Sequence, residues 1–190
     1  MEVSRETDEI VIGTVKTLLP VYGIDVLIKS FALVKKSMPG KKLKLIIAGE
    51  GKEREALEAL CVELDVRENV EFVGRIANDK VPEFISRMDV FVALSRNESF
   101  GVAVLEAMAC GVPVVVSDAD GFREVVQDGI TGFIVPRENA EAAAEKILAL
   151  LDDASMARTM GQEGRRHVVE NYNWNSSVDT MMQVYENYMK

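Results

Sequence analysis

The sequence predicts an α/β domain with a doubly wound, parallel, Rossmann-like sheet and appended C-terminal helices. Short runs rich in β-branched residues alternate along the chain with longer amphipathic runs. The short runs are apolar on both faces, which is typical of strands in a parallel sheet that helices cover on both sides. Beyond Leu151 the alternation stops, and only helical patterns follow.

Six short apolar runs are expected to be strands. They are Ile10–Val15, Leu43–Ala48, Val70–Val73, Val90–Ala93, Val112–Val116 and Gly132–Val135. The amphipathic runs between and after them are expected to be helices. They are Gly23–Ser37, Lys52–Leu64, Lys80–Arg87, Phe100–Cys110, Phe122–Gln127 and Ala140–Leu150. The pattern does not give the order of the strands in the sheet.

The helix over Phe100–Cys110 has recognisable signals at both ends. Ser99 is of a residue type that caps helix N-termini, Gly111 suits a left-handed residue after the last turn, and Pro113 prevents continuation. We therefore predict a strand, loop, helix and strand between Val90 and Val116.

The chain divides into three parts. Residues 1–9 are a tail or linker, residues 10–151 form the domain, and residues 152–190 form two further helices, Asp153–Glu170 and Trp174–Met189. The apolar set of the last helix, from Val178 to Tyr188, is broad for packing on one surface, so a second surface is expected to meet it.

The amino-acid composition excludes several classes of protein. The 190 residues are 48% hydrophobic, enough for one sizeable core, and carry 31 acidic against 22 basic residues, net −9. This balance argues against a general nucleic-acid or anionic-membrane binder. Cys61 and Cys110 are too few for a disulfide framework or a metal site, which favours a reduced, cytoplasmic setting. We find neither a signal peptide nor an apolar run that approaches a membrane span.

The carboxyl ends of parallel strands meet at one edge of the sheet, where ligands bind in such folds. The loops after Val15, Ala48, Val73, Ala93 and Val116 should therefore face one crevice. At the start of a helix, free N–H groups and the helix dipole favour an anion such as phosphate.

Two glycine-rich junctions offer such a helix start, but each is ambiguous taken alone. Residues Ser99–Val102 could hold an anion or form an ordinary turn beside a solvated Glu98. Residues Ala48–Lys52 lack both the Gly-x-Gly-x-x-Gly dinucleotide pattern and the Walker sequence, so a plain turn is favoured there.

A longer pattern distinguishes the first junction. Glu98 and Glu106 are embedded in Ser-x-x-Glu-Ser-Phe-Gly-x-x-x-Leu-Glu-Ala-Met-Ala-Cys-Gly-x-Pro, over Ser95–Pro113. This stretch resembles the signature of family 4 glycosyltransferases, the retaining group 1 enzymes of GT-B architecture. Further segments match in the family's order, from near Ile10 to the end: Tyr22–Phe31, Ile47–Leu57, Val70–Gly74, Gly121–Val135 and the closing helix from Trp174.

Such enzymes have two Rossmann-like domains facing a cleft, and the chain resembles only the second, which binds the nucleotide-sugar donor. The resemblance therefore implies a missing N-terminal acceptor domain and a truncated or excised piece. It also implies that the terminal helix crosses back to that domain, which would account for the apolar set from Val178 to Tyr188.

The resemblance implies a role for each matched residue. Glu98 is the catalytic candidate and holds hydroxyls of the donor sugar, and Glu106 accepts hydrogen bonds from the ribose. Amides of Phe100 to Val102 hold sugar hydroxyls or the diphosphate, and the backbone at Arg75 and Ile76 meets the base. The expected donor site comprises Lys16, Gly51, Arg75, Glu98, Ser99, Phe100, Gly101, Val102, Leu105 and Glu106.

Neither a metal nor another cofactor is expected. The single histidine, His167, lies in a basic helical run that suits a surface or capping role. A glycosidase-like acid and nucleophile pair is rejected, because one carboxylate is committed to ribose and retaining transferases of this class are described as front-face reactions assisted by the leaving phosphate.

The first loop departs from the family. Many relatives carry there an Arg and a Lys that neutralise the diphosphate, and this chain has Thr17 and Tyr22. Lys16 is the candidate replacement, shifted by one residue. A second departure is Asp120, where a Gly-Gly pair is common.

The predicted function is donor binding for a retaining glycosyltransferase that moves a sugar, typically a hexose, to an unknown acceptor, with this fragment alone nearly inactive. Two alternatives stay open: a non-catalytic nucleotide-sugar or assembly module, and a nucleotide-sugar epimerase using Glu98 and Glu124. The expected partners are a nucleoside-diphosphate sugar and the acceptor domain, with no nucleic acid. Any membrane contact, at the inner membrane face, would be made by the missing domain.

Overall fold

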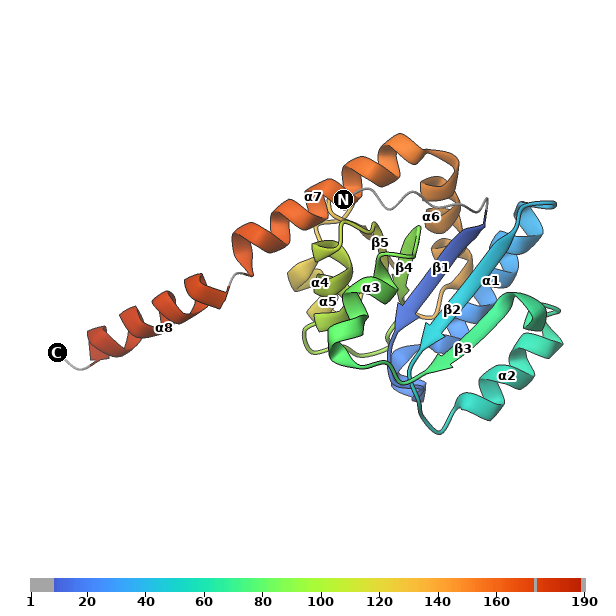
Figure 1. The fold of residues 1–190 in the computed structure, drawn as a ribbon, viewed down its shortest axis with the longest axis horizontal. Coiled ribbons are helices and arrows are strands. Elements are labelled where there is room, and N and C mark those ends of the chain that lie inside the picture. Colours follow the sequence, from blue (N-terminus) through green and yellow to red (C-terminus); the bar gives the residue numbers. More distant parts are fainter. Residues whose placement is uncertain (1–8, 173, 189–190) are drawn as a thin grey trace.

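The fold is organised around one six-stranded parallel sheet in the order β3-β2-β1-β4-β5-β6 (Figure 1). The structure is a computed structural model that describes residues 9–172 and 174–188. The strands are β1 (Ile10–Val15), β2 (Leu43–Ala48), β3 (Val70–Gly74), β4 (Val90–Ala93), β5 (Val114–Ser117) and β6 (Phe133–Val135). The doubly wound, Rossmann-like class is thereby confirmed, and its switch point lies between β1 and β4.

Helices cover both faces of the sheet. The helices of the described residues are α1 (Ile24–Ser37), α2 (Arg54–Glu63), α3 (Val81–Ile85), α4 (Val102–Ala109), α5 (Asp120–Val125), α6 (Ala140–Asp152), α7 (Ala154–Asn171) and α8 (Trp174–Tyr188), of which α8 does not pack on the sheet. Three 3₁₀ turns accompany them: η1 (Pro20–Tyr22), η2 (Arg67–Asn69) and η3 (Asn78–Lys80). One apolar core lies under α1, α2 and α6, and a second lies under α3, α4 and α5.

The strands have this apolar character because both of their faces are covered. Phe31 of α1 fills the first core, and Phe91 of β4 and Phe122 of α5 fill the second, all three fully buried. Burying side chains of this size contributes roughly 1.5–3 kcal/mol each. The two cores hold the carboxyl ends of β1 to β4 in fixed positions relative to one another.

Several predicted boundaries differ from the structure, among them the starts of α4 and β5 and both ends of α5, which spans Asp120–Val125 rather than Phe122–Gln127. Helix α4 begins at Val102 after Gly101 as N-cap, so the predicted cap at Ser99 and start at Phe100 are wrong. Gly101 has φ 96°, and a Cβ there would lie 2.9 Å from the Phe122 ring, so the chain can turn into the helix only at this glycine. Val112 is not yet in β5, because its N–H bonds back to the Ala107 carbonyl.

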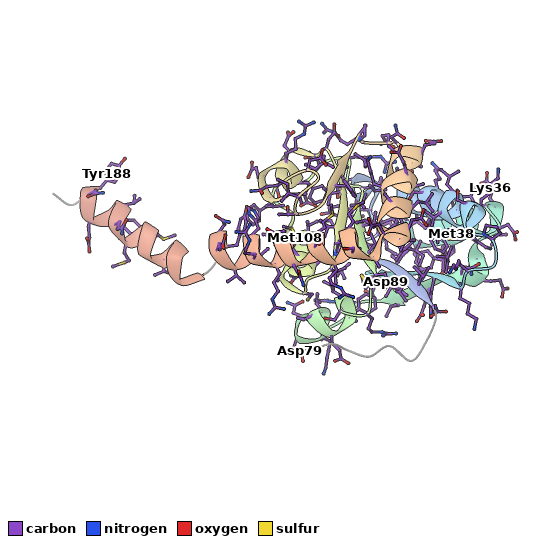
Figure 2. The ribbon with its side chains drawn as sticks, turned by 90° about the horizontal axis from the view of Figure 1, so that it is seen from above. Lys36, Met38, Asp79, Asp89, Met108 and Tyr188 are labelled. Carbon is purple, nitrogen blue, oxygen red and sulfur yellow. The ribbon has the colours of Figure 1, made fainter. Side chains whose placement is uncertain are left out.

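The C-terminal helices leave the body of the domain one after the other. Helix α7 packs along α4, where Gly164 brings the helix close to Met108 (Figure 2). Helix α8 projects away from the sheet, with Tyr188 near its far end (Figures 1 and 2). Its apolar side chains are exposed: Val178, Met181, Met182, Val184, Tyr185 and Tyr188. The prediction that a second surface covers this helix stays a prediction.

Among the described residues, no helix is both long enough and apolar enough to cross a membrane.

Candidate functional site

A cavity of about 640 Å³ lies at the carboxyl ends of the strands. Its walls are the loops after β1, β2, β3 and β4 together with the first turn of α4. Four of the five loops predicted to face one crevice therefore do so. The fifth, after β5, supports the site from behind, because the Gly121 N–H donates to the Glu98 carbonyl at 3.0 Å.

Lys16 and Glu98 face each other across the mouths of β1 and β4. The Lys16 ammonium lies 2.5 Å from Glu98 Oε2, and the side chains are only 15% and 10% exposed. The same ammonium sits 4.6 Å from the centre of the Tyr22 ring. The shift of this lysine by one position from the family pattern does not turn its side chain away, since the ammonium lies in the cavity.

The loop that carries Glu98 is fixed by further hydrogen bonds. The Ser95 hydroxyl lies 3.5 Å from Glu98 Oε2, and the Ser117 hydroxyl donates to the Ser95 carbonyl at 2.5 Å. Gly121 approaches this loop so closely that a Cβ would lie 2.4 Å from the Phe100 nitrogen. The carboxylate is thus held in place by strands and loops on both sides.

Helix α4 opens directly into the cavity. Gly101, Val102 and Ala103 line it, and the first N–H groups of a helix have no intrahelical acceptor. These donors and the positive end of the helix dipole can accept an anion.

Glu106, one turn into α4, is the second carboxylate of the cavity. Burial raises the pKa of this side chain above the ordinary glutamate value. A carboxylate that has lost part of its hydration gains most from ligand hydroxyls that donate to it.

The loops after β3 and β2 supply further charged and polar groups. Arg75 and Asn78 line the cavity with Ile76, and Glu50 faces it from the loop after β2. The cavity thus carries two cations, Lys16 and Arg75, against three carboxylates, so that any anionic ligand depends strongly on backbone donors as well.

Most of the predicted donor-site residues come together. Lys16, Arg75, Ser99, Phe100, Gly101 and Val102 line the cavity with the two glutamates, as do Thr17 and Tyr22. Gly51 and Leu105 do not. Gly51 packs against the Leu18 backbone, where a Cβ would lie 2.1 Å from the carbonyl oxygen, and Leu105 is buried in the core under α4.

Sequence reasoning missed Glu50, Asn78, Val81 and Ala103 in the cavity wall. Each lies near a strand end or a helix start, which is a signal that position along the chain could have supplied. What it could not supply is the direction of the side chain.

His167 and the cysteines lie outside the cavity. The His167 ring packs against Tyr172 with centroids 5.7 Å apart, and its Nδ1 lies 3.2 Å from the Asn171 amide nitrogen. Cys61 is buried, which raises its pKa to about 11, and both cysteines are free thiols. Within residues 9–172 and 174–188, no group of three or more His, Cys, Asp or Glu side chains is placed to hold a metal ion.

A family model described as glycosyl transferases group 1 matches residues 2–167. The chain belongs to the group 1 glycosyltransferases. An uncharacterised glycosyltransferase of Methanocaldococcus jannaschii is 33% identical to this group 1 chain over 95% of its residues, which correspond to 46% of that protein.

Two solved structures agree with the fold. Sucrose-phosphate synthase from Thermosynechococcus elongatus superposes with a TM-score of 0.87 and 32% identity, over 96% of this group 1 chain and 46% of its own. An Anabaena protein, HepE, in complex with UDP and glucose, superposes with a TM-score of 0.86 and 23% identity, over 95% and 49%. The chain spans less than half the length of the Methanocaldococcus jannaschii protein and of other curated relatives that it matches.

Proposed function

We propose that the chain binds the nucleoside-diphosphate sugar donor of a retaining, family 4 glycosyltransferase. The observation that carries the proposal is the cavity itself, which brings Lys16, Glu98, Glu106 and the first turn of α4 to one edge of the sheet. Support also comes from the fold of HepE, whose structure contains UDP and glucose.

Each part of the donor has a matching group in the cavity. The ribose hydroxyls would donate to Glu106, and the diphosphate would lie against the start of α4 and the Lys16 ammonium. Hydroxyls of the sugar would meet Glu98, and the base would lie at the loop of Arg75 and Ile76.

The chemistry follows from this placement. The bond between the anomeric carbon and the diphosphate breaks as negative charge develops on the leaving phosphate. The helix dipole of α4 and the ammonium of Lys16 stabilise that charge where it forms. The acceptor hydroxyl attacks from the same face, and its proton passes to the leaving phosphate, so that a metal and a protein nucleophile are unnecessary.

The acceptor side belongs to an N-terminal domain that packs against the exposed apolar face of α8. The chain alone is then expected to be nearly inactive, and substantial sugar transfer by these 190 residues would contradict that division. We place the enzyme in the cytoplasm, with any contact to the inner membrane face made by the acceptor domain.

The epimerase alternative loses one of its two acid/base candidates. Glu124 lies outside the cavity wall, on α5, where its carbonyl accepts a hydrogen bond from the Tyr172 hydroxyl. A non-catalytic module would bind the same ligands, and the upstream sequence would distinguish it from an enzyme.

Calorimetry with UDP, GDP and ADP tests the proposal. Glu106→Ala should weaken the binding of the preferred diphosphate about tenfold or more, because a charged acceptor for the ribose is lost. Glu55→Ala, an exposed position on α2, should leave the affinity unchanged. Binding of none of the three diphosphates, or an unaltered affinity in Glu106→Ala, would count against donor binding.

A further inference from the structure

We propose that Arg96 is a positioning residue that holds the Glu98 loop against the first loop and so sets the meeting of Glu98 and Lys16. Arg96 lies two residues before Glu98 in the β4–α4 loop, and it is not part of the cavity wall. Its link to sugar binding rests on the proposed function, whereas its link to the geometry of Lys16 and Glu98 does not.

The Arg96 side chain joins segments that are distant in sequence. Its two terminal nitrogens lie 2.9 Å from the two carboxylate oxygens of Asp25, in the first turn of α1. It also donates to both carboxylate oxygens of Glu138, in the loop after β6, and to the Pro20 carbonyl of η1. Hydrogen bonds with Asp25 raise the pKa of Arg96, so the guanidinium stays charged.

The backbone of Arg96 takes part in the same junction. Its N–H donates to the Val21 carbonyl at 2.8 Å, and its carbonyl accepts from Arg137 at 3.3 Å. Beside it, Gly23 approaches the Leu94 carbonyl so closely that a Cβ would lie 2.0 Å from the oxygen. The start of the β4–α4 loop, at Leu94 and Arg96, is therefore fastened to η1 and to the residue that follows it.

Glu138 supports a specific role for this cluster. It adopts φ 59°, in the left-handed region that costs a non-glycine residue about 1–2 kcal/mol. The strained backbone aims its carboxylate at Arg96, which also has Asp25 as a partner. Such strain persists where the surroundings determine the geometry strongly.

The two ends of this junction meet in the cavity. On the rear side, Arg96 fixes η1 against the β4–α4 loop. On the cavity side, the ring of Tyr22, the last residue of η1, lies against the Lys16 ammonium, which pairs with the Glu98 carboxylate. A shift of either loop would separate Lys16 from Glu98, so the distance of 2.5 Å between them depends on Arg96.

Replacement of Arg96 by lysine should remove its hold on the positions of Lys16 and Glu98. A lysine keeps the charge but cannot donate to Asp25 through two parallel bonds and still reach Glu138 and the Pro20 carbonyl. Arg166→Lys is the matched control, because Arg166 on α7 is likewise held between two carboxylates, Glu163 and Glu170, but on an exposed helix face.

A double-mutant cycle of Lys16→Met and Glu98→Gln tests the positioning role without any ligand. The stability of each variant in the cycle is measured by urea unfolding. In the wild-type background, the double variant's unfolding equilibrium constant should differ about 2- to 100-fold from the value expected if the effects of the two single substitutions were independent, and this factor is the coupling between Lys16 and Glu98. In the Arg96→Lys background the coupling should vanish within error, and in the Arg166→Lys background it should remain. Asp25→Asn, which removes the bidentate partner, makes the same test if Arg96→Lys is too unstable to titrate.

Binding supplies the second measurement. Arg96→Lys should lower the affinity for a nucleoside-diphosphate sugar at least threefold more than the affinity for the matching nucleoside diphosphate, because Glu98 is expected to contact the sugar. Undiminished coupling in both Arg96→Lys and Asp25→Asn, even with lowered stability, would overturn the positioning role. Failure of every nucleotide to bind would refute the proposed function alone, since the cycle would still decide the role of Arg96.

Discussion

Two strand-to-helix loops at the same edge of the sheet, β4–α4 and β2–α2, each carry a glycine that packs closely, but Gly101 and Gly51 do different things. In the β4–α4 loop, Gly101 turns the chain into α4 at the cavity wall. In the β2–α2 loop, Gly51 packs against the Leu18 backbone outside the cavity, and the Glu53 N–H donates to the Leu18 carbonyl. A glycine pattern therefore marks a close approach, and only the structure tells whether a ligand or the chain itself is approached.

The two loops are also held differently. Backbone hydrogen bonds join the β2–α2 loop to the first loop, as from the Leu18 N–H to the Glu50 carbonyl at 2.9 Å. The β4–α4 loop has backbone hydrogen bonds as well, and charged side chains add to them, through Arg96 on one side and Lys16 on the other. We expect substitutions in the β2–α2 loop to affect folding stability, and substitutions in the β4–α4 loop to affect both folding stability and ligand binding.

Gly51→Ala should have the largest effect. Its Cβ would lie within 2.8 Å of three backbone atoms of Leu18, so the loops must separate, at a cost of about 3 kcal/mol or more in unfolding free energy. Urea unfolding measures this. Gly40→Ala is the control, since Gly40 has φ 85° with open space around it and should lose only about 1–2 kcal/mol. Equal losses would show that Gly51 is not confined by Leu18.

Gly101→Ala should act on stability and binding together. The residue must keep φ 96° and press on the Phe122 ring, which costs about 1–3 kcal/mol, and any relaxation moves the start of α4. Thermal unfolding and calorimetry with the preferred nucleoside diphosphate should both show a loss. If binding survived undiminished, the first turn of α4 would not be the phosphate subsite.

Lys16→Met should lower the affinity for the preferred nucleoside diphosphate about tenfold. The substitution removes the ammonium beside Glu98 that is proposed to contact the diphosphate. Lys35→Met is a matched control on α1, where the ammonium donates to the Asp65 carbonyl at an exposed site. Affinities measured by calorimetry in low salt should separate the two variants. An equal effect of both would indicate long-range charge rather than contact.

The smallest effect concerns the pH dependence of binding. Burial raises the pKa of Glu106, so the side chain gains its proton as the pH falls through a value above that of ordinary glutamate. A protonated Glu106 is the poorer acceptor, and the affinity should decrease toward acid pH. The ratio of the wild-type affinity to that of Glu106→Gln, measured from pH 7.5 to 5, cancels the titration of the phosphate. A ratio that does not change with pH would contradict the role of ionised Glu106.

The raised pKa of Glu106 also predicts how the folding stability changes with pH. Desolvation makes the ionised form costly in the folded state, so the cost is present at neutral pH and is relieved as the pH falls through the raised pKa. Glu106→Gln should therefore be no less stable than the wild type at pH 7 in urea unfolding. A clear destabilisation would mean that Glu106 has a stabilising partner in the folded chain.

The sequence by itself determined the elements and most of the cavity residues. Strands β1, β2 and β4 lie where the apolar runs predict them, because strands covered on both faces need continuous apolar side chains. Glu98, Glu106 and Lys16 were found from a motif and its position, since the ends of parallel strands must meet at one edge. The start of α4 was misplaced, because Ser99 has a capping side chain but only Gly101 fits against Phe122.

Tertiary structure alone decided the strand order, the exclusion of Gly51 and Leu105 from the cavity, and the pairing of Lys16 with Glu98. It also decided the role that we propose for Arg96, whose partners lie 42 and 71 residues away along the chain. These features depend on which loops become neighbours. Local periodicity and propensity fix the elements but not the packing that brings distant charges within hydrogen-bonding distance.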